Sequence, residues 1–126
     1  MSGFASGWQA GAAIRPFPIA PGTPMAGYMA RSGPATGTLD PLTIGAIVLR
    51  AQGEQVVIVT ADLAGIDEAL VSEIAGAAGL PSDRLMLCAS HTHSGPAGVT
   101  ARLHPADDDQ SDPALRAAFV LSLIHI

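Results

Sequence analysis

The strongest constraint on the fold is a strand–helix–strand pattern between residues 56 and 89. Two apolar, β-rich runs, residues 56–60 and 85–89, flank a segment of helical periodicity that Asp67 is expected to cap and Gly79 to close. Such a βαβ unit is right-handed, and both strands end at the same edge of the sheet. The predicted buried face of the helix contains Ala69, Leu70, Ile74, Ala77 and Ala78.

The residues before this unit predict two further strands. Residues 42–50 form another β-rich run, and the turn-sized gap at residues 51–55 contains a glycine, so the two neighbouring runs are expected to pair as a hairpin. Residues 12–14 and 17–19 suggest a short first strand that Pro16 and Pro18 interrupt, which places it at an edge. The predicted fold class is α/β: a mixed sheet with a β-hairpin and a right-handed βαβ unit, in an incomplete domain.

A long loop joins the first strand to the hairpin. Residues 21–41 are rich in Gly, Pro, Ser and Thr, and loops of that length in compact domains are often functional. Met25, Tyr28 and Met29 would anchor it as an ordered pocket wall. Arg31 either meets an anionic substrate group or is solvated.

Composition narrows the classes of function. The chain of 126 residues is 48% hydrophobic and 13% charged, and its net charge of −5 argues against a nucleic-acid partner. Its single cysteine, Cys88, cannot form an internal disulfide, which favours a reducing compartment. Residues 1–11 do not resemble a secretory signal, and no apolar run is long enough for a transmembrane segment. We therefore expect a cytoplasmic protein.

The polar turn at residues 90–98 is the best candidate for a functional site. It follows a predicted buried strand, at the edge of the sheet where α/β proteins bind ligands. If the backbone stays extended, His91 and His93 project to the same side, and two imidazoles can face one ion. A catalytic zinc usually has three protein ligands, so the pair supplies part of a site. The alternative is two solvent-facing or packed histidines.

Two other groups of polar residues are weaker candidates. The βαβ geometry brings Asp62 to the same rim, where it either accepts a hydrogen bond from a ligating imidazole or caps its own loop. His104 lies among Asp107, Asp108 and Asp109, and this stretch is either a source of further ligands or a solvated loop.

The string at residues 90–98, together with residues 56–63 and 24–28, resembles the N-terminal part of the neutral, non-lysosomal ceramidase family over residues 13–98. The resemblance implies hydrolysis of an amide at a zinc ion, with His91 as a ligand and His93 beside the reacting amide. Gly27 would line the substrate pocket, and the loop from Gly95 to Gly98 would help to shape it. One departure is Leu39, because family members commonly have a histidine before the Asp-Pro-Leu that follows.

The resemblance also implies a ceramide-like substrate, meaning a small-molecule or lipid-like amide. The family's other zinc ligands, a histidine, a glutamate and a tyrosine, would lie beyond this sequence. Residues 1–120 are thus predicted to be the N-terminal part of such a domain, inactive alone. Two alternatives are a metal-dependent phosphoesterase of the polymerase-and-histidinol-phosphatase type, which also carries His-Thr-His-Ser, and a non-catalytic α/β fragment.

The last six residues have an unusual sequence. Residues 121–126 read Leu-Ser-Leu-Ile-His-Ile, which is the in-frame translation of a transposase adapter used for sequencing libraries. We predict that residues 121–126 are a non-native tail, so that His125 carries no function. An ordinary apolar helix end is the alternative.

Overall fold

The computed structural model describes residues 7–100 and 111–126. Along the chain the elements are β1 (Gln9–Pro16), β2 (Thr43–Ala51), β3 (Glu54–Ala61), α1 (Glu68–Ala78), the short 3-10 helix η1 (Ser82–Arg84), β4 (Leu85–Ala89) and α2 (Pro113–Ile124).

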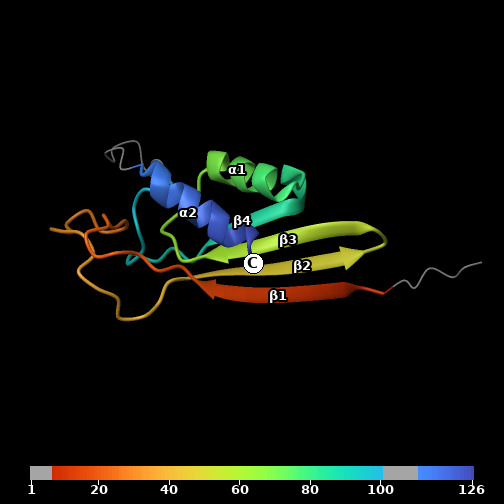
Figure 1. Cartoon of the computed structure of the whole chain (residues 1–126), viewed down its shortest axis with the longest axis horizontal. Helices are drawn as coiled ribbons and strands as arrows, with labels where there is room; N and C mark the ends of the chain where they lie inside the picture. Colours follow the sequence, from red (N-terminus) through yellow and green to blue (C-terminus); the bar gives the residue numbers. More distant parts are fainter. Residues whose placement is uncertain (1–6, 101–110) are drawn as a thin grey trace, which may run out of the picture.

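The four strands form one mixed sheet in the order β1-β2-β3-β4 (Figure 1). β1 and β3 run antiparallel to β2, whereas β4 pairs in parallel with β3 and follows it through α1. The predicted α/β class, the hairpin and the parallel strand pair joined by a helix are therefore confirmed. The β3–β4 register sets Ala61 opposite Ala89, so the two strands end side by side.

The hairpin turn is tighter than the sequence indicated. β2 ends at Ala51 and β3 begins at Glu54, so Gln52 and Gly53 form the turn. Both have positive φ, 53° and 84°, as a type I′ turn requires, and this geometry matches the twist of the strands.

β1 occupies the predicted edge, but its extent differs from the prediction. It begins at Gln9 and ends at Pro16, and residues 17–19 are not part of it. Phe17 instead leaves the sheet and enters the core, where its ring meets that of Phe119 edge-on at 5.3 Å between centroids.

Both helices pack on the same face of the sheet (Figure 1). The Asp67 side chain accepts a hydrogen bond from the amide of Leu70, and Gly79 ends α1 in the left-handed conformation, as predicted. The buried face of α1 is narrower than predicted, since Ala69, Ala77 and Ala78 are exposed. The residues of α1 that are buried are Leu70, Ile74 and Ala75.

α2 is fastened to α1 by a charged side chain. The Arg116 guanidinium donates to Glu73 at 2.7 Å, to Asp67 at 3.3 Å and to the Val99 carbonyl at 3.0 Å. Burial alone would lower the pKa of Arg116, but the two carboxylates outweigh it and raise the pKa. The long-range contacts hold α2 against the N-terminal end of α1 and the loop that follows β4.

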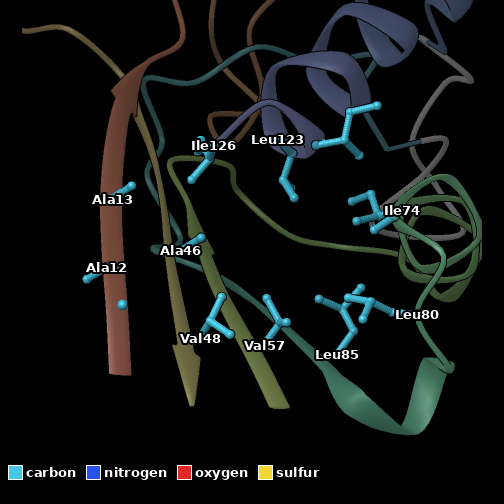
Figure 2. A pocket seen from close by; sticks show the side chains of 13 residues that line it. Ala12, Ala13, Ala46, Val48, Val57, Ile74, Leu80, Leu85, Leu123 and Ile126 are labelled. Carbon is cyan, nitrogen blue, oxygen red and sulfur yellow. The ribbon is translucent and has the colours of Figure 1, made fainter. Parts of the chain in front are cut away.

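An apolar pocket of about 380 Å³ lies between the sheet and the helices (Figure 2). Leu123, in the last turn of α2, and Ile126, which follows the helix, point into it opposite Val48 and Val57 of the sheet. Leu123 is buried and Asp112 caps the start of α2. The non-native origin of residues 121–126 stays a prediction. Among the described residues, no helix is long and apolar enough to cross a membrane.

Candidate metal centre

The site lies where the parallel strands end. The loops that follow β3 and β4 leave the sheet at one edge, and the amide of Ser90 donates to the Ala61 carbonyl at 3.0 Å. The long loop between β1 and β2 lies at the same end of the sheet (Figure 1). Three segments that are distant in sequence therefore meet at this edge, as the βαβ geometry predicts for two of them.

The backbone at His91 is not extended, contrary to our expectation. β4 ends at Ala89, and His91 has φ of 63°, in the left-handed region that non-glycine residues seldom adopt. This conformation brings the His91 Nδ1 to 2.6 Å from the Ala64 carbonyl oxygen. Because a carbonyl only accepts hydrogen bonds, Nδ1 carries the proton and the lone pair of Nε2 is left for another partner.

The two imidazoles lie next to each other, as expected, although the backbone conformation that brings them together is not the extended one. Their ring centroids are 4.8 Å apart at an interplanar angle of 83°, and the two Nε2 atoms are 3.3 Å apart. Two nitrogen ligands of a tetrahedral zinc, each about 2.0–2.1 Å from the metal, lie roughly 3.3–3.4 Å from each other. The spacing suits a shared cation as well as an N–H···N hydrogen bond.

Asp62 lies at the same edge but does not orient the imidazole. Its Oδ2 accepts hydrogen bonds from the Thr43 amide at 2.8 Å and the Thr43 hydroxyl at 2.9 Å. Of the two alternatives for Asp62, the bond to a ligating imidazole is not found, because the Ala64 carbonyl receives the His91 proton. A backbone carbonyl carries no sequence signal, which is why it was missed.

Asp62 nevertheless keeps its charge at neutral pH. Burial by itself would raise the pKa of Asp62, but hydrogen bonds from the Thr43 amide and from the Ser90 and Thr43 side chains outweigh it and lower the pKa. The ionised carboxylate joins the start of β2 to the ends of β3 and β4.

Two of the predicted pocket glycines lie against the site residues. A Cβ on Gly27, whose φ is 105°, would lie 2.7 Å from the His93 Cα, so this position excludes any side chain. A Cβ on Gly95 would come within 2.9 Å of the Asp62 carbonyl oxygen. Contact of these glycines with a substrate stays a prediction.

The third predicted glycine, Gly98, performs a connecting role. It has φ of 101°, and its carbonyl accepts from the amide of Asp112, the residue that caps α2. It thereby ties the histidine loop to the second helix.

Of the loop residues named from the sequence, Tyr28 and Arg31 contact His93, whereas Met29 does not anchor the loop. Met29 and Leu39 are wholly exposed, so the predicted anchoring by Met29 is wrong. Tyr28 contacts the His93 ring edge-on, with centroids 5.0 Å apart. Arg31 faces neither solvent nor an open anion site, because its Nη2 donates to the His93 carbonyl at 2.6 Å. Nothing in the sequence pattern links these residues to His93, 62 positions away.

The fit to a metal is that of a partial site. Within residues 7–100 and 111–126, no group of three or more His, Cys, Asp or Glu side chains is placed to hold an ion. His104 and Asp107, Asp108 and Asp109 lie outside the described residues. The His91 and His93 nitrogens remain candidate donors, and the zinc site stays a prediction.

The fold and the histidine pair together define an α/β domain with a candidate metal centre at the carboxyl edge of its parallel strands. The structure is similar to that of neutral ceramidase from Pseudomonas aeruginosa, with a TM-score of 0.78 and 23% sequence identity over 94% of this chain. A structure described as ceramidase complexed with C2 has a TM-score of 0.79 and 22% identity over 93% of this chain.

The chain corresponds to a small part of these proteins. It covers 20% of each of the two ceramidase chains. The TM-scores of 0.78 and 0.79 show a shared fold, and at identities of 22–23% the likeness shows the fold alone. No protein-family model and no curated protein matches the sequence.

Proposed function

We propose that this chain is the N-terminal part of a zinc-dependent amide hydrolase of the neutral ceramidase type. The observation that carries the proposal is the His91–His93 pair, with Nε2 atoms 3.3 Å apart, on a fold shared with neutral ceramidase at a TM-score of 0.78. The substrate class is an N-acyl amide with a lipid-like part, because the two similar structures are ceramidases.

His91 is the proposed metal ligand. Its Nδ1–H is engaged by the Ala64 carbonyl, which fixes the ring and directs the Nε2 lone pair outward. When bound, zinc polarises an amide carbonyl and lowers the pKa of a coordinated water.

His93 lies beside that nitrogen and serves the reacting amide. An N–H on its Nε2 donates to the amide oxygen as negative charge develops there, which stabilises the transition state. Gly27 packs directly against His93, which any side chain at position 27 would displace.

The chain alone is proposed to be inactive. A catalytic zinc has at least three protein ligands as a rule, and His91 is the one ligand proposed here, because the Nε2–H of His93 is assigned to the substrate amide. The remaining ligands, a histidine, a glutamate and a tyrosine by resemblance, belong to the rest of a longer parent protein.

The decisive experiment compares the longer reading frame, recovered from the source DNA, with the 126-residue chain. We expect stoichiometric zinc and hydrolysis of N-acylsphingosine by the longer protein, and neither zinc nor turnover in its His91→Ala variant. The 126-residue chain should show no turnover. Hydrolysis that survives His91→Ala would refute the proposal, and turnover of a phosphate ester in place of the amide would favour the phosphoesterase alternative.

A further inference from the structure

Arg31 makes an unusual set of contacts for an arginine in a loop. Its Nη2 donates to the His93 carbonyl at 2.6 Å, and its Nη1 lies 3.6 Å from the sulfur of Met25. The guanidinium carbon is 5.4 Å from the centroid of the Tyr28 ring. The Nε is buried and has no hydrogen-bond partner, so the two terminal nitrogens determine where this side chain sits.

Arg31 therefore reaches His93 by two routes. The direct route is the charge-assisted hydrogen bond to the His93 carbonyl, a class of bond roughly twice as strong as a neutral one. The indirect route passes through Tyr28, whose ring lies within cation–π distance of the guanidinium and meets the His93 imidazole edge-on at 5.0 Å. One contact orients the peptide group of His93, and the other supports its ring.

The rest of the loop already fixes the register of these contacts. Met25 and Pro96 form an isolated antiparallel bridge, in which the Ala26 amide donates to the Gly95 carbonyl at 3.0 Å and the Ala97 amide to the Pro24 carbonyl at 2.8 Å. These bonds hold the segment after His93. Arg31 adds the contact on the His93 carbonyl itself.

We propose that Arg31 is a positioning residue, which fixes the peptide and ring of His93 so that its Nε2 faces that of His91. The functional meaning of this rests on the proposed hydrolase, but the position of the ring can be measured without metal or substrate. In Arg31→Lys only part of this positioning should be retained. The ammonium can reach the His93 carbonyl, but it lacks the planar guanidinium that contacts the Tyr28 ring.

The test uses the whole 126-residue chain and NMR of the His93 side chain. In Arg31→Met we expect loss of the nuclear Overhauser contacts between the Tyr28 and His93 rings, and a changed Nε2 shift of His93. Arg31→Lys should retain a weakened Tyr28–His93 contact. The matched control is Arg50→Met, because Arg50 donates to the exposed Gln55 side chain, in the part of the hairpin near its turn.

The readouts separate positioning from general destabilisation. The methyl signals of the core residues Ile44 and Val59, both fully buried, should be unchanged in Arg31→Met. Unchanged Tyr28–His93 contacts in Arg31→Met would overturn the proposal. If that variant does not fold, Arg31→Lys decides: wild-type contacts at full strength would overturn it as well.

A zinc titration of the wild-type chain keeps this proposal apart from the proposed function. Zinc alone should shift the His91 and His93 ring signals. Failure to shift them would count against the metal site, whereas the NMR comparison of the Arg31 variants would still decide the role of Arg31.

Discussion

The two ends of the sheet each contain one non-glycine residue with positive φ. In the described part of the chain these are Gln52 in the hairpin turn, at 53°, and His91 in the candidate site, at 63°. At the hairpin end the conformation is required by a two-residue turn, and neighbours in sequence satisfy it. At the site end it aims an imidazole at the carbonyl of Ala64, 27 residues away.

The difference shows where the strain is useful. A left-handed residue costs roughly 1–2 kcal/mol relative to the right-handed conformation unless the residue is glycine or asparagine. At Gln52 a residue that tolerates positive φ, such as asparagine, can remove this conformational cost without loss of a tertiary contact. At His91 the same conformation directs the imidazole of a candidate metal ligand to the Ala64 carbonyl, and strain of this kind is common at active sites.

The largest effect is expected in the core beneath the site. Ile44 is fully buried and pairs with Ala61 at the end of β3 that leads into the site, whereas Val56 is 38% exposed near the hairpin turn. We expect Ile44→Ala to lower the free energy of unfolding by about 2–5 kcal/mol, since it removes buried methyl groups and leaves a cavity.

Val56→Ala is the matched change near the hairpin turn, and it should cost less than about 1 kcal/mol because much of that side chain is already in water. Urea unfolding followed by circular dichroism measures both variants. Equal losses of unfolding free energy in the two variants would contradict the interpretation that the site end of the sheet depends on core packing more than the hairpin end does.

The second effect concerns the carboxylates at the two ends. Asp62 accepts two hydrogen bonds from Thr43, whereas Glu54 forms an exposed ion pair with Arg84 at 2.6 Å. We expect Asp62→Asn to lower stability by about 1–3 kcal/mol, because it weakens bonds to a charged acceptor at a part-buried site. Glu54→Gln should change stability by less than about 1 kcal/mol, as exposed pairs usually do.

The same carboxylate gives a pH dependence with a defined sign. Because hydrogen bonds lower the folded-state pKa of Asp62 below its ordinary value of 3.8, its stabilising contribution is fully present above that value. It is lost as the pH falls through the lowered folded-state pKa. Unfolding midpoints from pH 7 to pH 2 should therefore decline less steeply at the acid end in Asp62→Asn. Parallel curves for the variant and the wild type would show that Asp62 is not the group responsible.

How much of this could be predicted from the sequence depends on the range of each contact. The βαβ unit, the hairpin and the cap at Asp67 are encoded by local periodicity and turn residues, and the structure confirms them. The approach of His91 and His93 was expected for an extended backbone. The two rings do approach each other, but through the left-handed conformation of His91, which the two-residue period does not predict.

The contacts that hold the histidines are of another kind. The bond from His91 to the Ala64 carbonyl and the bond from Arg31 to the His93 carbonyl both use backbone oxygens, which every residue has. Which carbonyl accepts each bond depends on the tertiary packing of loops, and loops have no hydrophobic periodicity from which this packing could be predicted. The same limit explains the assignment of Asp62 to an imidazole, since its actual partner Thr43 lies at the start of another strand.

The smallest effect tests the two strained residues directly. Gln52→Asn should raise the free energy of unfolding by about 0.5–1 kcal/mol, since asparagine before Gly53 favours a type I′ turn and tolerates the left-handed conformation.

In His91→Asn the relief of strain and the loss of the bond to Ala64 oppose each other, so the net change in the free energy of unfolding should stay within about 1 kcal/mol. The same variant should lose the zinc response of the His93 ring. Thermal unfolding and the zinc titration measure the two quantities on one sample. A His91→Asn protein that is strongly destabilised would mean that His91 serves the fold; one that is stable but unresponsive to zinc would mean that the strain at this end is maintained for the site.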